Sequence, residues 1–526
     1  MNKIKNKKKL TSIILFIISV AAYYRATSAY FVADDFFYLY QRNNPDFYSP
    51  FTHFFYQPIT LGIYYLNYFW AGFDHFKYHW FVIILNGLNN IIFFNIAYLL
   101  TGGIFRAFII SLLSAIYYFS ADNMIWINCT NNVLCAFFYF LSILYSIKFN
   151  NSKQKKHLIF MLLFLNSALY TREMGVSLFI VLIILDAVYF FRKKTLSLDF
   201  KFFLKKHSFV VLSGFIYIFI MALGPTFRYK KLSFDRGAYE LIFDIKSILI
   251  NINWFFFRTF IPFSFGSHFK FDIIHNIIQI VRFNYISLIS IFILSFIIRN
   301  RHFYFGVLWI LITASPYLLL NIYFVHTGER YFYLPHMGLG FMLIGIWIYL
   351  KNYLKNVTAK KITAIFLMLI LVLYSVVSFY AIQHRINSWI DAGNISYRFL
   401  DSVKKTFSDI PENSVLFIKN VPRWRSSPPK LIVLITGATF ALNLHYEKKN
   451  IEVVPYWEDA GIENYEFLNK KFKFYNYYLL EYENGIIKKW NPDTKYNNSI
   501  LKYTVENKMK KIDISSFNLT HYQIEN

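Results

Sequence analysis

The sequence has little cysteine, few acidic residues and few charges of any kind. Two cysteines, Cys129 and Cys135, are too few for a disulfide framework, and their spacing matches no zinc-binding pattern. Only 16% of the 526 residues are charged, and 29 acidic residues face 55 lysines and arginines. In contrast, 56% are hydrophobic and 21% aromatic, more apolar surface than a water-soluble core could bury. We therefore expect an integral membrane protein with many spans.

The formal net charge of +26 raises the question of a nucleic-acid partner. The lysines and arginines, however, form short clusters between apolar runs, as the positive-inside rule describes for cytoplasmic loops. No basic stripe is interleaved with aromatic residues on a soluble segment, so we expect no nucleic-acid partner. The N-terminal "MNKIKNKKKLTSIILFIISVAAYY" lacks a cleavage site followed by a soluble domain, which predicts an uncleaved first span with a cytoplasmic N-terminus.

The apolar runs predict an all-α polytopic membrane domain over residues 1–388. The ambiguous segment 240–265 carries Asp244, Lys246 and Arg258. If it spanned the membrane, the later basic clusters would fall outside, so we assign it to the outer surface as an amphipathic segment. Long outer loops are then expected at 31–78 and 225–275. About eleven spans result, at 10–30, 79–100, 105–120, 132–147, 157–170, 174–191, 208–224, 277–298, 304–324, 332–350 and 363–383.

The tail after residue 388 has a different pattern. Its apolar runs shorten to strand length in "SVLFIKN", "LIVLITG", "IEVVPYW" and "YYLLEYENGIIKKW", and turn signals such as "SSPP" and "ENG" separate them. Residues 389–526 are thus predicted to form a small C-terminal α/β domain. With the eleven spans, this domain is extracytoplasmic, and the protein lies in the plasma or inner membrane.

The unusual polar clusters all fall on the outer side of this topology. Such a one-sided set suggests a site at the outer face. For Asp34 and Asp35 the alternative is a simple membrane-boundary marker, and for Arg172 and Glu173 it is an ion pair that joins helices. His326 and His336 form no metal-binding motif. The clusters are Asp34-Asp35, Tyr56-Gln57-Pro58, Asp122, Arg172-Glu173 and Glu329-Arg330-Tyr331.

Several blocks, in order, resemble membrane glycosyltransferases of the GT-C superfamily. The chain is most similar to the transmembrane O-mannosyltransferase-like group. The blocks are "VADDFFYLYQRN", "FFYQPITLGIYYLNYFWAGFDHFKYHWF", "SADNMIWINCTNNVLCAFFYF", "ALYTREMGVSLFIVLIILD", "GERYFYLPHMGLGFML" and "HRINSWIDAGNISYRFL". Gln57 stands where the group usually has Arg, and Ser120-Ala121-Asp122 replaces a His-Pro-x-His. The group's tetratricopeptide tail is absent.

The resemblance implies an inverting enzyme that moves a sugar from a polyprenyl phosphate to an acceptor hydroxyl at the non-cytoplasmic face. The acceptor is a protein, glycan or lipid, and membrane lipid surrounds the site. It implies Asp34 or Asp35 as general base, with the choice left open. Arg172 and Arg330 would bind the donor phosphate, supported by Glu173, Glu329, Tyr331, Gln57 and Asp122. Some members use a divalent metal such as magnesium or manganese, but no residue here demands one.

Two other functions are compatible with parts of the sequence. A catalytically inactive relative would retain the fold, and the departures at Gln57 and Asp122 leave that reading open. A lipid or solute transporter would explain charges near the membrane. No inverted repeat or pair of broken helices is visible in the sequence, which disfavours the transporter.

Overall fold

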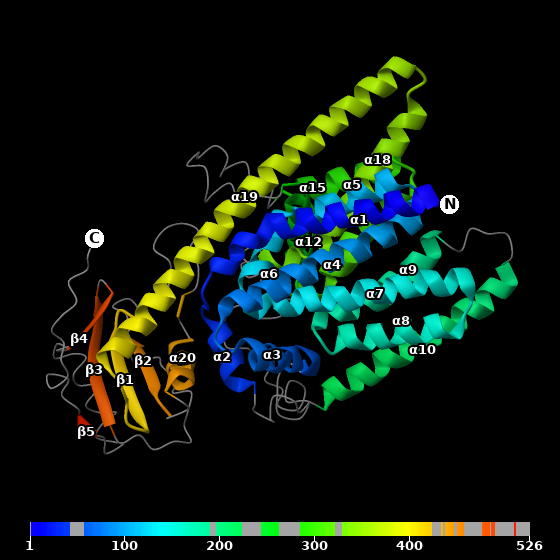
Figure 1. Cartoon of the computed structure of the whole chain (residues 1–526). Coiled ribbons are helices and arrows are strands. Elements are labelled where there is room, and N and C mark those ends of the chain that lie inside the picture. The colour runs from blue at the N-terminus through cyan, green and yellow to red at the C-terminus, as the bar shows by residue number, and fades with distance from the viewer. Residues whose placement is uncertain are drawn as a thin grey trace. The chain divides into compact units, whose positions relative to one another are not determined.

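The structure is a computed structural model of the whole chain (Figure 1). It describes residues 2–42, 57–189, 196–223, 243–261, 284–320, 329–422, 433–434, 437–446, 450–456, 476–483, 485–489 and 510–511.

Two compact units make up the chain. The first, helical unit contains Met1–Thr27, Asn44–Asn67 and Phe76–Ile386. The second contains Ser28–Asn43, Tyr68–His75 and Asn387–Asn526. The predicted boundary at residue 388 lies close to the C-terminal one. Unlike the prediction, parts of the loop 31–78 belong to the second unit, because the segment that carries Asp34 packs on C-terminal elements.

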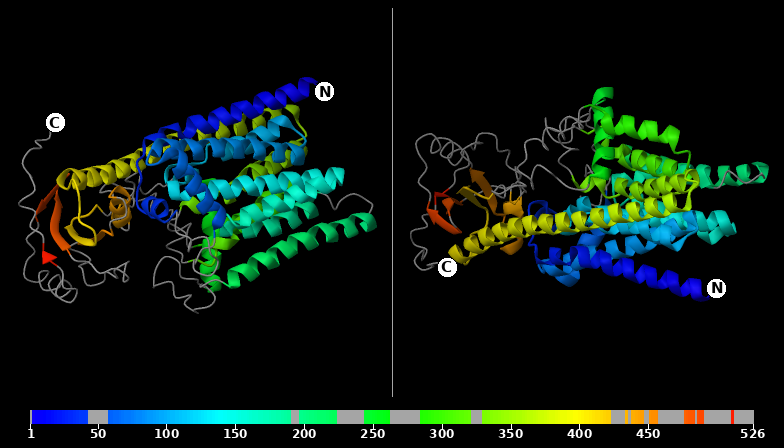
Figure 2. Two further views of the ribbon diagram at one scale, coloured as in Figure 1. Left: turned by 60° about the horizontal axis from the view of Figure 1, so that its bottom comes forward. Right: turned by 90° about the horizontal axis from the view of Figure 1, so that it is seen from above.

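The first unit is built from apolar helices, of which α7 and α8 run side by side as a hairpin (Figures 1 and 2). Lys153, between them, adopts a left-handed conformation (φ 57°) that ends α7. The helices are α1 (Asn2–Tyr23), α3 (Pro58–Ala71), α4 (His75–Thr101), α5 (Ile104–Ala115), α6 (Ala121–Ile125), α7 (Thr130–Ser152), α8 (Lys155–Leu169), α9 (Ser177–Tyr189), α10 (Leu196–Ala222), α12 (Ile245–Phe260), α15 (Ile286–Ile297), α16 (Arg301–Ala314), α18 (Gly338–Tyr353) and α19 (Val357–Thr406).

Five helices in the described residues are long and apolar enough to cross a membrane, or six if a bent pair counts as one span. That pair is Ile104–Ala115 with Tyr118–Ile125, bent by 54°. A polytopic membrane protein is therefore confirmed by length and composition. Each of the eleven predicted spans overlaps a helix in the described residues, but several of these helices are too short to cross a membrane, and the count of eleven stays a prediction. For example, α16 has 14 residues, or about 21 Å at 1.5 Å per residue, against a hydrocarbon core of about 30 Å.

The ends of the predicted ninth and tenth spans differ from the structure for a local reason. Pro316 lies in a 3₁₀ turn after α16, and Pro335 begins another just before α18. Proline cannot donate a backbone hydrogen bond, so it favours the end or the first turn of a helix. Residues 332–337, which the sequence analysis placed at the start of the tenth span, lie in short turns instead, and the first of these turns also carries Arg330 and Tyr331.

Glycines allow α16 and α18 to approach closely. A Cβ atom on Gly306 would lie 2.5 Å from the carbonyl oxygen of Gly338 and 2.8 Å from the backbone nitrogen of Met342. A Cβ atom on Gly345 would lie 2.6 Å from the backbone nitrogen of Phe303. Small residues at such crossings let two backbones pack directly, which suits helices surrounded by lipid.

The last predicted span is much longer than expected. Helix α19 covers 50 residues, about 75 Å, and continues 23 residues beyond the predicted end at 383. The sequence "QHRINSWIDAGNISYRFLDSVKKT" is polar but contains no proline, and its one glycine, Gly393, does not end the helix. The predicted span ends at residue 383 because hydropathy falls there. The residues that follow are polar but can still form a helix, which continues to Thr406.

The segment predicted to lie on the outer surface at 240–265 contains α12. Asp244 caps this helix by accepting a hydrogen bond from the Ser247 backbone N–H at 2.9 Å. Trp254, Phe255 and Arg258 are buried, and α12 packs on α15 and α16. The rest of the predicted outer loop 225–275 lies outside the described residues, apart from 243–261.

The second unit contains a mixed sheet, shown in Figure 1. Strand β1 (Ser414–Lys419) lies between β2 (Glu452–Tyr456) and β3 (Asn476–Glu483), parallel to both. Strand β4 (Ile486–Lys489) returns antiparallel to β3 through a turn with Gly485 (φ 84°), and β5 (Lys510–Lys511) pairs in parallel with β3. Helix α20 (Gly437–His445) precedes β2. The predicted strand "LIVLITG" falls largely outside the described residues, and Val433 and Leu434 within it are not in a strand.

Candidate functional site

The acidic pair stands at the start of α2 (Asp34–Gln41), in the second unit. The residue before it, Ala33, has φ 43° and ψ −116°, a conformation that non-glycine residues rarely adopt. Its N–H donates to the Val433 carbonyl oxygen at 2.7 Å. Strained backbone of this kind persists when the surroundings impose it, and it is concentrated at functional sites.

The two aspartates differ in their surroundings. The Asp35 side chain is 1% exposed, and its Oδ2 accepts a hydrogen bond from the Val32 N–H at 3.0 Å. In return, the Asp35 N–H donates to the Val32 carbonyl oxygen, also at 3.0 Å. Asp35 therefore closes the turn that begins α2, much as a capping box does. Asp34 is partly exposed, so its carboxylate is the more accessible of the two.

Helix α20 holds this turn from the other side. Phe440 on α20 packs edge-to-face on Phe37, with ring centroids 4.9 Å apart, and also contacts Tyr40 at 5.5 Å. Gly437 begins α20, and a Cβ atom there would lie 2.5 Å from the Ala33 carbonyl oxygen. Helix α20 and the acidic pair belong to the same unit, and the position of α20 thus determines where the pair lies. The sequence analysis did not predict this dependence.

Gly437→Ala is expected to weaken this contact. The added methyl group cannot fit against the Ala33 carbonyl unless α20 or the start of α2 moves, and overpacking of this kind costs about 1–3 kcal/mol. We expect a lower thermal unfolding midpoint and a loss of any activity that depends on Asp34. Gly485→Ala is the control. A Cβ atom at residue 485 meets no neighbour, but the backbone there is left-handed, so this change strains only the β3–β4 turn. Equal stability of Gly437→Ala and the wild type would contradict the contact.

Arg172 belongs to a polar network in the first unit, in the turn between α8 and α9. Its Nε donates to Glu173 Oε1 at 3.2 Å, and its Nη1 donates to Asn131 Oδ1. Gln57 joins the network by donating from Nε2 to Glu173 Oε2 at 3.0 Å. Burial lowers the pKa of Arg172, but Glu173, together with Tyr317, Cys129 and Tyr331, outweighs burial and raises that pKa, so the guanidinium stays cationic. Glu173 is thus placed to orient Arg172.

The first turn of α3 fixes the network in position. Thr60 Oγ1 donates to the Thr171 carbonyl oxygen at 2.7 Å, and the Ile59 N–H donates to the Tyr170 carbonyl oxygen at 3.3 Å. These bonds tie the start of α3, where Gln57 lies, to the turn that carries Arg172. Residues 57 and 172 are far apart in the sequence, and their proximity results from this backbone pairing.

Arg330 lies on aromatic side chains. Its guanidinium carbon is 5.0 Å from the centroid of the Trp126 ring and 4.9 Å from that of Tyr331, and its Nη2 donates to the Tyr331 hydroxyl at 3.1 Å. Tyr331 in turn contacts Tyr317, with ring centroids 4.5 Å apart. The turn Glu173–Val176, directly after Arg172, packs against the turn Ser315–Tyr317, which carries Tyr317. Arg172 and Arg330 therefore lie around one tyrosine pair.

Asp122 forms a different contact from the one expected. It makes a bidentate ion pair with Arg385 of α19, with Nε–Oδ1 at 2.8 Å and Nη2–Oδ2 at 2.9 Å, and both side chains are 8% exposed. Its neighbour Asn123 donates to the Arg330 carbonyl oxygen at 3.4 Å. Asp122 therefore supports the Arg330 region through the position of α6, which its ion pair with Arg385 fixes.

Sequence reasoning missed Arg385, Asn131 and Trp126 as parts of this region. For Arg385 a signal existed, because an arginine next to an apolar span usually needs an acidic partner, and few acidic residues are available on the outer side. For Asn131, within "INCTNN", no pattern distinguished it from its neighbours. The Glu329 side chain and all of Tyr56 and His326 lie outside the described residues. Within those residues, no three His, Cys, Asp or Glu side chains could together hold a metal ion.

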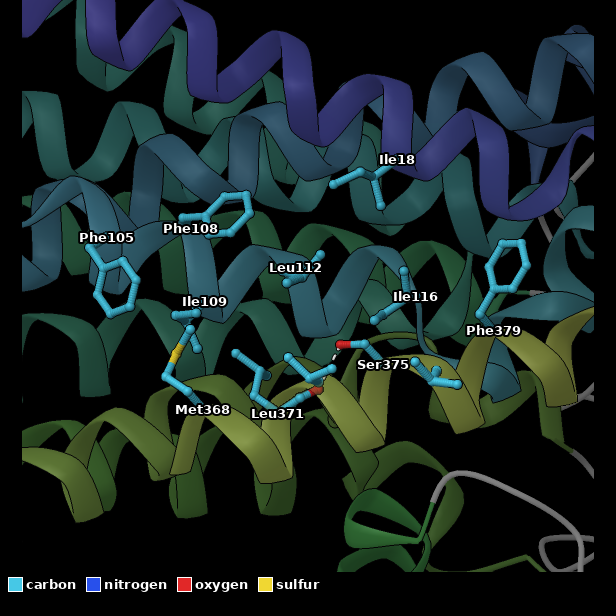
Figure 3. A pocket seen from close by; sticks show the side chains of 12 residues that line it. Ile18, Phe105, Phe108, Ile109, Leu112, Ile116, Met368, Leu371, Ser375 and Phe379 are labelled. Carbon is cyan, nitrogen blue, oxygen red and sulfur yellow. Dashed lines mark hydrogen bonds between the residues drawn. The ribbon is translucent and has the colours of Figure 1, made fainter. Parts of the chain in front are cut away.

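An apolar groove of about 480 Å³ lies between α1, α5 and α19 (Figure 3). Its lining includes Phe108 and Leu112 of α5 and Met368 and Phe379 of α19. The polar residue in the lining, Ser375, donates its hydroxyl to the Leu371 carbonyl oxygen at 2.7 Å, so it presents little polarity to the groove. Ile116, which also lines the groove, directly precedes Tyr117.

Comparisons with known proteins give a weak structural likeness. No protein-family model matches the chain, and no curated protein sequence matches it. The chain is similar to ArnT from Cupriavidus metallidurans bound to undecaprenyl phosphate, with 10% identity, 86% of each chain covered and a TM-score of 0.45. The apo state of the same protein gives 10% identity, the same coverage and a TM-score of 0.47.

Proposed function

We propose that the protein is an integral-membrane inverting glycosyltransferase. It would move a sugar from a polyprenyl phosphate to an acceptor hydroxyl at the non-cytoplasmic face. The observation that carries the proposal is the pair of arginines around Tyr331 and Tyr317, in turns next to apolar helices. The sequence resemblance to the GT-C superfamily supports the same reaction.

Two guanidiniums in this position suit an anionic phosphate. The phosphodiester of a lipid-linked sugar donor carries one negative charge. When the sugar is transferred, the polyprenyl phosphate leaves as a phosphomonoester, which carries a second negative charge. Guanidinium N–H groups can pair with phosphate oxygens in a fork, and they stabilise charge that develops as the bond breaks. Tyr331 and Trp126 would hold the planar guanidinium of Arg330 in one orientation. Less conformational entropy is then lost when the phosphate binds.

The acidic pair would supply the base. Asp34 would accept the proton of the acceptor hydroxyl while its oxygen attacks the anomeric carbon and the carbon–oxygen bond to the phosphate breaks. The configuration inverts, and the proton stays on Asp34 until it passes to solvent. Asp35 would act as a positioning residue, because its carboxylate is engaged with the Val32 backbone. This proposal assigns different roles to two residues that the sequence analysis could not separate.

A metal is not part of the proposed mechanism. A magnesium or manganese site would need several oxygen ligands in one place, and the described residues contain no such set of acidic and histidine side chains. The proposal assigns the phosphate charge to Arg172 and Arg330.

Arg330→Lys tests the anion-binding role. Lysine keeps the charge but loses the fork and the stacking on Trp126, so we expect sugar transfer to fall by about 10- to 100-fold with normal membrane insertion. The measurement is transfer of labelled sugar from polyprenyl phosphate in membranes that contain each variant. Arg299→Lys, at the other end of the helices by the topology prediction, is the matched control. Unchanged transfer by Arg330→Lys would remove Arg330 from the site.

The groove in Figure 3 fits the hydrocarbon chain of the same donor. We include this occupant because the groove is apolar, lies beside helices that are long enough to span the membrane, and is lined by Ile116, which directly precedes Tyr117. The ring of Tyr117 stacks on that of His336, with centroids 4.0 Å apart. His336 lies six residues after Arg330, so the groove and Arg330 are connected through these two rings.

Leu112→Trp should fill the groove. We expect the KM for the polyprenyl donor to rise about tenfold while kcat changes little, because one lost apolar contact region weakens binding without touching the reacting atoms. Leu163→Trp, on the exposed face of α8, is the control for a larger side chain in a lipid-facing position. A donor KM equal to that of the wild type would show that the chain binds elsewhere.

A further inference from the structure

A basic cavity of about 540 Å³ lies among α1, α4, α7 and α8, in the first unit. Two leucines and six polar residues line it. The polar residues are Lys8, Asn95, Lys148, Asn151, Ser152 and His157. They come from four helices that pack into one bundle, so the cavity is a property of the tertiary structure and not of one loop. None of these residues belongs to the region around Arg172 and Arg330.

Two lysines share this cavity. Lys8 Nζ is 4.7 Å from the Tyr98 ring centroid, and Lys148 Nζ is 4.6 Å from that of Tyr145. Both lysines line the same cavity, so their positive charges repel each other across it. The lining contains no carboxylate, and within the described residues neither lysine forms an ion pair. Like charges held together in this way are unfavourable until an anion binds between them.

The other lining groups match a phosphate. Asn95 and Asn151 carry amide donors, and the Ser152 hydroxyl and His157 Nδ1 are 2.7 Å apart, which fixes the rim of the cavity. Leu99 and Leu144 form the apolar part of the cavity lining. Ile159 and Leu163, which follow His157 on α8, have exposed apolar side chains. Polar donors next to exposed apolar helix faces occur at headgroup depth in a bilayer.

We propose that this cavity binds the phosphate of an anionic membrane lipid, in the leaflet on the side of the N-terminus. A free phosphate has the same chemistry, but the apolar side gives a lipid additional contacts for its glycerol and acyl groups. The proposal is independent of the glycosyl-transfer reaction, because it concerns other residues.

The test compares lipid binding to the full chain in detergent by native mass spectrometry. The probes are phosphatidylglycerol and phosphatidylcholine at equal concentration. The cavity variant is Lys8→Gln with Lys148→Gln. The control is Lys5→Gln with Lys9→Gln, which removes the same charge from exposed positions on α1. We expect the wild type and the control to prefer phosphatidylglycerol by about tenfold, and the cavity variant to lose this preference. A retained preference in the cavity variant, or an equal loss in the control, would overturn the proposal.

Two further arms address folding and the source of the phosphate. Lys8→Arg with Lys148→Arg keeps both charges and should retain the preference, so a loss caused only by misfolding of the Gln variant would be recognised. Inorganic phosphate alone should leave the wild-type melting temperature unchanged. If it instead stabilises the wild type but not the cavity variant, and phosphatidylglycerol is not preferred, the lipid is the wrong source.

Discussion

Asp34→Asn is expected to reduce sugar transfer by about 10²–10⁴-fold, the usual effect of removing a general base. The amide keeps the size and hydrogen-bonding capacity of the side chain but cannot accept the proton from the acceptor hydroxyl. The Asp34 side chain is partly exposed at the start of α2, so its replacement should leave expression and the unfolding temperature unchanged. The measurement is transfer of labelled sugar from polyprenyl phosphate in membranes.

Asp35→Asn is the matched control for the neighbouring position. Its amide oxygen can still accept the hydrogen bond that the Val32 N–H donates to Asp35 Oδ2. We expect a loss of less than about tenfold, because a neutral acceptor replaces a charged one in a bond worth about 1 kcal/mol. Asp35→Ala should in addition lower stability, since the buried Val32 N–H loses its partner. If Asp34→Asn retains near-full transfer while Asp35→Asn is inactive, the assigned roles are reversed; if both retain it, neither is the base.

Arg385→Met is expected to be the most destabilising single change among the groups considered. It leaves the Asp122 carboxylate buried without its bidentate partner, and breaking a buried pair on one side costs about 3–5 kcal/mol. The measurement is the thermal unfolding midpoint in detergent. Lys405→Met is the control on the same helix, because the Lys405–Asp401 pair has side chains that are 53% and 30% exposed. Exposed pairs contribute about 0–1 kcal/mol, so its midpoint should hardly move.

The double replacement Arg385→Met with Asp122→Leu separates the charge from the packing. Replacing both members by apolar side chains of similar size is often neutral, because the desolvation cost disappears with the pair. We expect the double variant to recover most of the stability lost by Arg385→Met. If the double variant is as unstable as the single one, the contribution of Arg385 is packing, and the ion pair is not the source of the effect.

From the sequence, the membrane environment and the helical positions could be predicted. Runs such as "LTSIILFIISVAAYY" need only their own residues to form a helix in lipid, since every backbone hydrogen bond is made within the helix. The strands "SVLFIKN" and "IEVVPYW" could also be located from their apolar side chains, which match β1 and β2, but their hydrogen bonds depend on neighbouring strands. Helix ends were predicted less well, because hydropathy fell at residue 383 while α19 continued to Thr406.

The side-chain partnerships depended on the tertiary structure. Asp122 and Arg385 are 263 positions apart, and Gln57 and Glu173 are 116 apart. No local pattern relates residues at such distances, because their contact depends on how whole helices pack. Asp34 and Asp35 are adjacent and chemically identical, so the sequence could not separate them. Burial of Asp35 against the Val32 backbone, and the position of α20 beside Ala33, gave the two carboxylates different surroundings.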